Sequence, residues 1–154
     1  MTSTLSAHAD VTAPADKVWA LVSDLPGMGR LSPENTGGRW LRGATGPAVG
    51  ARFRGSNRNG WRRWSTSVRV TACTPGQAFG FDVSFAGIPV SAWAYDLAPS
   101  GDGCTVTETW TDRRPRWFAV VSGVTTGVSD RRTATLSGLE QTLAAVKRTA
   151  EHAG

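Results

Sequence analysis

Histidine and cysteine are scarce in this chain of 154 residues, and their scarcity excludes several kinds of site. The two histidines, His8 and His152, lie near the chain ends, where a general base in a preformed pocket is not expected. The two cysteines, Cys73 and Cys104, lie far apart in the sequence, and we expect free thiols rather than a disulfide. These residues are too few to supply the ligands of a structural zinc site. We therefore expect neither a metal nor a cofactor.

Known catalytic and nucleotide-binding motifs are missing as well. There is no Ser-His-Asp or Cys-His arrangement, no Walker loop and no dinucleotide-binding glycine pattern. Residues 43–60 are rich in glycine, but no helix is expected to follow them, so they do not form a phosphate cradle.

Long hydrophobic runs are also absent. No segment is apolar over enough residues to span a bilayer, so we expect no membrane insertion. The first ten residues have neither the basic start nor the apolar core of a secretion signal. The chain is therefore expected to be cytoplasmic.

Lysine is rare, and the basic charge is carried almost entirely by arginine. The net charge is +5 and the pI about 10.2, which favours anionic partners or reflects codon composition alone. Several arginines and two tryptophans cluster in residues 52–69, a pattern that nucleic-acid surfaces also use. Strand alternation instead places Arg52, Arg54 and Arg69 on a solvated face. We therefore do not expect nucleic-acid binding.

The last long segment, residues 129–150, has the pattern of an amphipathic helix. Leu136, Leu139, Leu143 and Val146 recur at steps of three and four, which places them on one stripe that must be buried. An earlier helix is expected to begin at Pro14 and to end at residues 26–27, where proline and glycine follow each other. Residues 117–128 are ambiguous and predict either a short helix or a flexible segment.

Most of the remaining chain alternates as β-strands do. Residues 5–11 predict a first strand, and residues 37–113 predict six more, joined by turns such as Asn59-Gly60 and Pro75-Gly76. The strand around residues 64–72 places Trp64, Thr66, Val68, Val70 and Ala72 on one face. The sequence therefore predicts a single α+β domain over residues 1–154, with an antiparallel sheet.

This order of elements resembles the helix-grip fold of the SRPBCC (START/Bet v 1-like) superfamily, and within it the polyketide cyclase/dehydrase-like group. The resemblance is carried by residues 11–19 (VTAPADKVW), 46–53 (GPAVGARF) and 139–151 (LEQTLAAVKRTAE). One departure is Leu31-Ser32-Pro33, where such proteins often have a tryptophan. The resemblance implies a curved seven-stranded sheet around a long C-terminal helix, with two short helices after the first strand.

The resemblance also implies a cavity between the sheet and the last helix that binds a lipid-like, polyketide or aromatic molecule. The protein is then a carrier or sensor, as a monomer or homodimer, or else a polyketide cyclase or dehydratase. The residues expected to contact the ligand are Phe53, Phe81, Trp93, Tyr95, Glu108, Trp110, Leu136 and Leu143.

Glu108 is the candidate with the clearest chemistry. Alternation places it between Val106 and Trp110 on the concave face, where burial raises the pKa of a carboxyl group. It either anchors a ligand and exchanges protons, or forms a structural ion pair with an arginine. Tyr95 either donates a hydrogen bond to the ligand or is an ordinary buried phenol. If the protein is an enzyme, Glu108 and Tyr95 are the expected catalytic residues. The seven tryptophans are either core residues or walls for a flat ligand.

Overall fold

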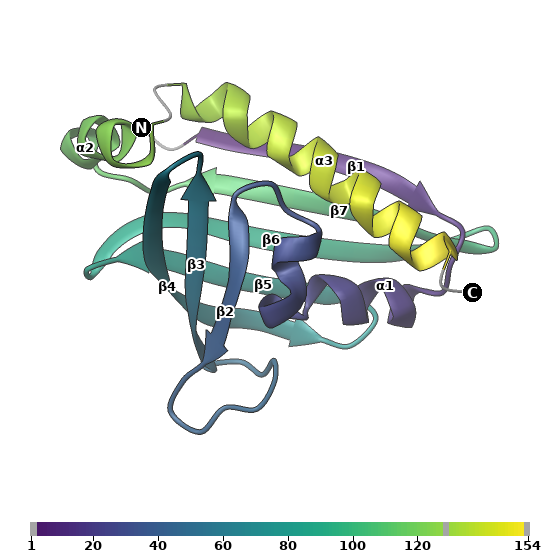
Figure 1. Ribbon diagram of the computed structural model, residues 1–154. Helices are drawn as coiled ribbons and strands as arrows, with labels where there is room; N and C mark the ends of the chain where they lie inside the picture. The colour runs from purple at the N-terminus through teal and green to yellow at the C-terminus, as the bar shows by residue number, and fades with distance from the viewer. Residues whose placement is uncertain (1–2, 128–129, 153–154) are drawn as a thin grey trace.

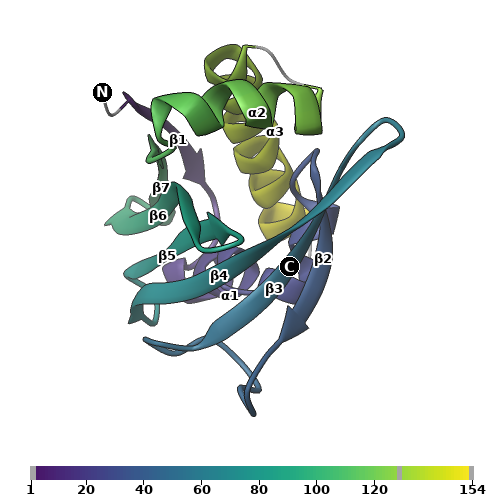
Figure 2. The same cartoon turned by 90° about the vertical axis from the view of Figure 1, so that its left-hand side faces the viewer.

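A single curved antiparallel sheet forms most of the molecule in the computed structural model, which describes residues 3–127 and 130–152. Its strand order is β1-β7-β6-β5-β4-β3-β2, so that all neighbours but β1 and β7 are consecutive in the chain. The sheet curls around the C-terminal helix α3 (Figures 1 and 2), which confirms the predicted α+β helix-grip architecture. The elements are β1 (Ser3–Val11), α1 (Ala15–Val22), the 3-10 helix η1 (Leu25–Arg30), β2 (Asn35–Trp40), β3 (Arg52–Asn59), β4 (Arg62–Thr74), β5 (Ala78–Phe85), β6 (Ile88–Ser100), β7 (Gly103–Asp112), α2 (Arg116–Thr126) and α3 (Arg131–His152).

The two short helices after β1 begin and end at residues that suit their positions. Pro14, predicted as the first helical residue, is instead the N-cap of α1, which begins one position later. Val18 and Val22 are fully buried. The side chain of Asp24 caps η1 by accepting a hydrogen bond from the backbone N–H of Gly27. These helices cover the part of the sheet that α3 leaves open (Figure 1).

Two details of the sheet differ from what the sequence predicts, one in a turn and one in the strand alternation. The β3–β4 hairpin has a two-residue loop of Gly60 and Trp61, because Asn59 still pairs with Arg62. Gly60 has a φ of +63°, which a glycine adopts without strain. In β4, a bulge after Val70 shifts the register. The prediction that Ala72 shares the buried face is therefore wrong, and Ala72 is exposed.

Helix α3 packs its buried stripe against the sheet near β1. Leu139, Leu143 and Val146 are buried, as predicted, whereas Leu136 is exposed. The C-terminal end is held by two contacts to β1 and the segment after it: the Nζ of Lys147 donates to the carbonyl of Asp10 (2.7 Å), and a carboxylate oxygen of Glu151 accepts from the backbone N–H of Thr12 (2.8 Å). The predicted first residue, Ser129, lies outside the described residues. No helix in the described part of the chain is long and apolar enough to cross a bilayer.

The ambiguous segment after β7 is the helix α2, which lies across one end of the space enclosed by the sheet (Figure 2). Its inner face carries Phe118, whose ring lies 6.0 Å from that of Phe85 on β5. It ends at Gly127, which adopts a left-handed conformation with a φ of +74°. The predicted end at Val128 lies outside the described residues.

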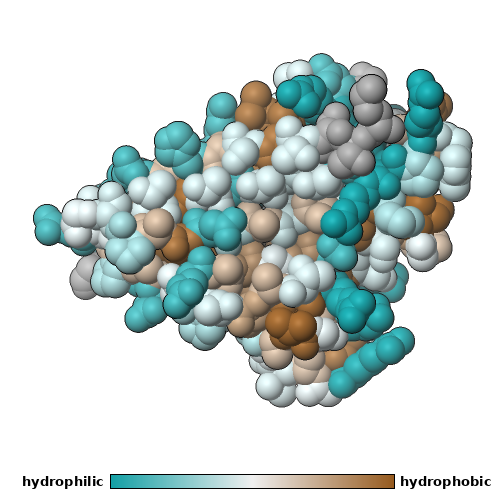
Figure 3. All heavy atoms as spheres, turned by 180° about the vertical axis from the view of Figure 1, so that it is seen from behind, coloured by the Kyte–Doolittle hydropathy of each residue, from teal (hydrophilic) through white to brown (hydrophobic). Residues whose placement is uncertain are grey.

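The outer face of the sheet has the mixed composition of a solvated surface. Seen from behind, hydrophilic, pale and apolar residues are interspersed (Figure 3). Arg52, Arg54 and Arg69 are exposed, as the strand alternation predicts. These three arginines are therefore directed away from the concave side of the sheet, where α3 packs.

Candidate functional site

A cavity of about 220 Å³ lies between the concave face of the sheet, α2, the first half of α3 and the segment before β2. An apolar cavity of roughly 150 Å³ already holds a benzene ring in another protein. The volume is therefore sufficient for a ring compound or a short acyl chain.

Aromatic and aliphatic side chains from five strands form the walls of this cavity. The rings of Phe81 and Trp93 are stacked, with an interplanar angle of 18° and centroids 6.4 Å apart. All the predicted ligand-contacting residues on strands line the cavity, namely Phe53, Phe81, Trp93, Tyr95, Glu108 and Trp110.

The two predicted helix residues, Leu136 and Leu143, do not line the cavity, and this expectation is corrected. Leu136 faces solvent and Leu143 is buried in the core beside the cavity. The stripe that faces the cavity is the neighbouring one on α3, and it consists of small residues, Ala134, Thr135, Gly138 and Thr142. These small side chains leave space between the helix and the sheet. The leucine stripe was expected to face the ligand because it must be buried, but its buried members pack in the core.

The seven tryptophans divide into three groups. Trp64, Trp93 and Trp110 line the cavity. Trp19 and Trp40 pack against the core, where the indole N–H of Trp19 donates to the carbonyl of Ala78 (2.8 Å). Trp61 and Trp117 are exposed on the surface. The core reading is therefore confirmed for Trp19 and Trp40. The reading as walls for a flat ligand stays a prediction for the three that line the cavity, and the two exposed tryptophans fit neither.

Glu108 is a buried carboxyl group in the wall of the cavity, with only 1% of its surface exposed. It lies in the middle of β7, directly opposite Tyr95 on β6, and the Tyr95 hydroxyl donates to its Oε2. Its Oε1 is buried and has no hydrogen-bond partner in the described part of the chain. Within residues 3–127 and 130–152, Glu108 forms no ion pair, so the alternative of a structural pair with an arginine is wrong.

The electrostatics of this pair follow from its burial. Loss of solvation raises the pKa of Glu108 from 4.5 to about 8, although the hydrogen bond from Tyr95 acts in the opposite direction. Burial, and then the neighbouring Glu108, raise the pKa of Tyr95 well above its ordinary value. At neutral pH both groups are therefore predominantly protonated. The Tyr95 hydroxyl is directed at Glu108, and the oxygen left to contact a ligand is Oε1.

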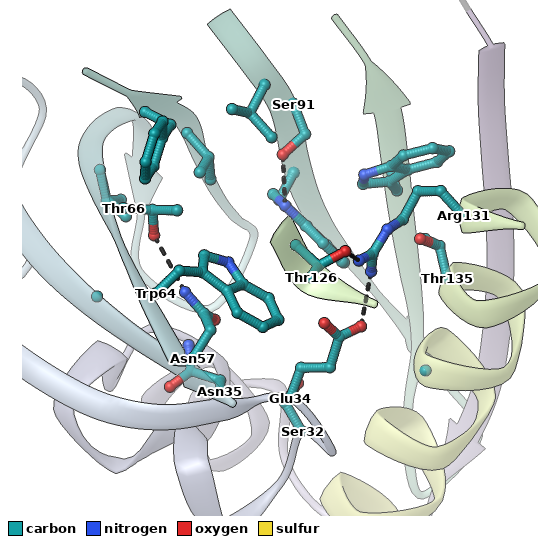
Figure 4. A pocket seen from close by; sticks show the side chains of 18 of the residues that line it. Ser32, Glu34, Asn35, Asn57, Trp64, Thr66, Ser91, Thr126, Arg131 and Thr135 are labelled. Atoms are coloured by element: carbon teal, nitrogen blue, oxygen red, sulfur yellow. Dashed lines mark hydrogen bonds and ion pairs between the residues drawn. The ribbon is translucent and has the colours of Figure 1, made fainter. Parts of the chain in front are cut away.

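A set of charged residues surrounds the other end of the cavity, next to α2. The guanidinium of Arg131, at the start of α3, lies 2.6 Å from the carboxylate of Glu34 and donates a hydrogen bond to the Thr126 hydroxyl (3.2 Å). These contacts bridge α3, the segment before β2 and the end of α2, as Figure 4 shows. We call this end of the cavity the mouth.

A second ion pair at the mouth joins the end of β7 to α2. Arg114 contacts Asp112 through three hydrogen bonds of 2.8–3.0 Å and donates another to the hydroxyl of Ser122 (3.2 Å). Burial acts to raise the pKa of Asp112, but the contacts to Arg114 and the attraction of Arg131 outweigh it and lower the pKa below 3.8.

Sequence reasoning did not identify these mouth residues. Glu34 and Arg131 are 97 positions apart, and each belongs to a segment whose pattern is that of an ordinary polar surface. Ser91 was missed for the same reason: its hydroxyl accepts from the indole N–H of Trp93 (3.1 Å) inside the cavity. Asn57 donates to Thr66 (3.4 Å) on the opposite wall (Figure 4).

The cysteines and acidic residues do not form a further site. Cys73 and Cys104 are free thiols. Nowhere in the described ranges do three or more His, Cys, Asp or Glu residues gather as metal ligands do.

A seven-stranded sheet curled around a helix, with an apolar cavity between them, defines the class of helix-grip proteins. The chain belongs to the family described as polyketide cyclase / dehydrase and lipid transport, whose model matches residues 2–150. A search of curated proteins finds no match.

Solved structures with the same fold come from several sources. A Polyketide_cyc-like protein from Corynebacterium glutamicum is 29% identical over 97% of this chain and 91% of its own length, with a TM-score of 0.66. The di-domain ARO/CYC StfQ from the steffimycin biosynthetic pathway is 13% identical, with a TM-score of 0.78; the match covers 99% of this chain and 52% of that one. The major latex-like protein 151 of Panax ginseng is 12% identical over 97% of this chain, with a TM-score of 0.73. The last two establish a likeness of fold only.

Proposed function

We propose that the protein binds a small, largely apolar ring or lipid-like molecule that carries a carbonyl or hydroxyl group. The observation that supports this proposal is the Oε1 of Glu108, which has no hydrogen-bond partner among the described residues, in a cavity whose walls are largely apolar. A buried polar atom without a partner costs about 1–3 kcal/mol, and a ligand that supplies the missing hydrogen bond recovers this free energy. The family description, which includes lipid transport, is consistent with the proposal.

The protonation state of Glu108 determines which ligand group it accepts. With a pKa of about 8, the carboxyl group is mostly neutral at pH 7. A neutral carboxyl group donates one hydrogen bond, and Oε2 already accepts from Tyr95, so the proton is available at Oε1. The preferred partner at neutral pH is a carbonyl oxygen, and above pH 8 it becomes a hydroxyl group.

The second candidate function is a cyclase or dehydratase that acts on polyketide-like substrates in the same cavity. It is favoured by the pKa of Glu108, which lies close to the pH at which a general acid and base is most effective. Glu108 would give its proton to a substrate carbonyl and take one from the adjacent carbon, while Tyr95 holds Oε2. The cavity walls would contribute by orienting a flexible chain.

Two substitutions at Glu108 test the binding proposal. Native mass spectrometry and extraction of the purified protein identify a bound molecule, which then serves as the ligand for titrations. Glu108→Gln keeps a donor and should leave the Kd within about threefold, whereas Glu108→Leu should weaken binding roughly 10- to 100-fold. The matched control is Glu140→Leu, because Glu140 is exposed on α3. An unchanged Kd in Glu108→Leu, or no bound molecule and no response to a panel of apolar ring compounds, contradicts the proposal.

The same variants separate a carrier from an enzyme. If the protein turns over a polyketide-like substrate, Glu108→Gln should abolish turnover while the Kd for that substrate is kept. If Glu108→Gln retains both turnover and binding, Glu108 is not the general acid and the enzyme reading fails.

A further inference from the structure

Helix α2 has an apolar outer face in addition to its buried inner face. Trp117, Val120 and Val124 are 61%, 72% and 74% exposed and lie on one stripe of the helix, opposite Phe118. Val121 lies between the two faces, because it is half-exposed and also lines the cavity. Single exposed apolar residues are ordinary, but a contiguous stripe marks an interaction surface.

The tip of the β3–β4 hairpin adds a further exposed tryptophan at the same end of the molecule. Trp61 is 80% exposed, and the guanidinium of Arg62 lies 4.4 Å from the centre of its ring. The tip adjoins the end of α2, because the side chain of Asn59 donates to the carbonyl of Thr126 (2.9 Å). Figure 2 shows α2 and the hairpin tip side by side at this end.

Positive charge flanks this apolar surface. Exposed arginines lie on α2, at the hairpin and at the start of α3, namely Arg116, Arg63 and Arg132. The acidic groups nearby already have partners: Asp82 pairs with Arg113, Asp112 with Arg114, and Glu34 with Arg131, while the exposed Asp130 caps α3. The surface therefore carries an excess of positive charge, in a chain whose net charge is +5.

We propose that the outer face of α2 and the tip of the β3–β4 hairpin form a docking surface for an anionic lipid membrane. Trp and Val side chains beside arginines are the composition of surfaces that lie in the membrane interface, where the rings enter the headgroup region and the guanidinium groups contact phosphates. The excess of positive charge beside these apolar side chains complements the negative surface of an anionic bilayer.

The proposed docking surface lies next to the mouth of the cavity. Val121 connects the outer face of α2 to the cavity, and α2 lies across the mouth. A molecule that leaves the bilayer at this point enters the cavity without crossing water. Membrane binding can be tested separately from the proposed function, because vesicles that contain no cavity ligand are sufficient to measure it.

The experiment is co-sedimentation of the full chain with vesicles of phosphatidylcholine alone and with 30% phosphatidylglycerol added. The wild type should bind the anionic vesicles at least tenfold more strongly, and about 0.5 M salt should remove most of this difference. Trp117→Ser/Val120→Ser/Val124→Ser should reduce binding at least tenfold. Arg63→Glu and Arg116→Glu should each reduce it about fivefold or more.

Matched variants on other surfaces act as controls. Val49→Ser removes an apolar side chain that is 67% exposed in the loop before β3, and Arg39→Glu reverses an exposed charge on β2. Both should bind as the wild type does. Brominated lipid should quench tryptophan fluorescence in the wild type and less in Trp117→Phe, whose binding is kept.

Three results would overturn the proposal. The first is absence of wild-type binding to anionic vesicles, and the second is an equal loss of binding in the control variants. The third is a change of oligomeric state in the α2 triple variant, with no vesicle binding by the wild type, which would identify the surface as a contact between copies of this chain. Circular dichroism and the thermal midpoint of each variant confirm that it is folded.

Discussion

The two ends of the cavity bury carboxyl groups in opposite ways. At the mouth, Asp112 and Glu34 each lie within 2.6–2.8 Å of an arginine nitrogen. Away from the mouth, Glu108 has a tyrosine as its partner and one oxygen without any among the described residues. The pKa of Asp112 is lowered and that of Glu108 is raised to about 8, although both residues belong to β7.

The presence or absence of an arginine partner suggests different roles for these carboxyl groups. A carboxylate that is paired with arginine has its hydrogen bonds satisfied. In the pair of Glu34 with Arg131, it also joins segments that are distant in the sequence. A carboxyl group that is buried without a cation lowers stability, and its retention is explained when a ligand completes its hydrogen bonds. The ion pairs of the mouth therefore hold the elements around the cavity, whereas Glu108 is the group through which the proposed ligand would be recognised.

The largest expected effect is the pH dependence of stability due to Glu108. Its pKa is about 8 in the folded protein and near 4.5 when unfolded, so between these values unfolding releases a proton. The free energy of unfolding should therefore fall by about 1.4 kcal/mol per pH unit from pH 5 to pH 8, and then level off. Urea denaturation of the wild type and Glu108→Gln measures this slope, which the variant should lack. Equal slopes in both proteins would place the ionisation elsewhere.

A smaller effect of opposite sign is expected from Asp112. Its side chain and that of Arg114 are only 20% and 10% exposed, so Asp112→Asn leaves a mostly buried guanidinium without its counter-ion and should cost about 2 kcal/mol at pH 7. Since the pKa of Asp112 lies below 3.8, this contribution is present at neutral pH and is lost as the pH falls below about 4. The control is Asp82→Asn, whose half-exposed pair with Arg113 should change stability by about 0.5 kcal/mol or less. Similar losses in both variants would contradict the structural role of the mouth pair.

The smallest effect on stability is expected at Glu34, and it should appear mainly in kinetics. Glu34→Gln weakens the bridge to Arg131 and should cost about 1 kcal/mol, because both side chains are partly exposed. Association and dissociation of the cavity ligand should both become faster, by about threefold to tenfold, with little change in Kd. Stopped-flow fluorescence measures both rates. Unchanged rates would show that ligands do not pass between Glu34 and Arg131.

The fold was largely predictable because most segments bury one face. Strand alternation and the turn residues predicted the strands, and the spacing of Leu139, Leu143 and Val146 predicted α3. Glu108 was identified for the same reason: a carboxylate between Val106 and Trp110 on an inward face conflicts with the pattern and indicates a function. The bulge after Val70 was not predictable, because alternation continues in the sequence where the pairing does not.

The remainder of the site depends on contacts that no local pattern records. Periodicity shows that α3 has a buried stripe, but not that the neighbouring stripe with Thr135 and Gly138 faces an open space. The pairing of Arg131 with Glu34 requires the curvature of the whole sheet, which brings the two segments together. The outer face of α2 was also missed, because the glycines of residues 117–128 obscured the helix to which Trp117 and Val124 belong.

The contacts of Lys147 and Glu151 with the chain around Asp10 and Thr12 fix one end of α3, whereas the other end meets the sheet through the mouth residues and α2. The packed stripe of α3 and the elements that surround the mouth of the cavity therefore occupy different parts of the chain. Substitutions in α2 and in the segment before β2 can change the entrance without altering the packed stripe of α3. Under the proposed function, a change of ligand or of exchange rate would therefore cost little folding stability, because the entrance and the packed stripe of α3 belong to separate segments.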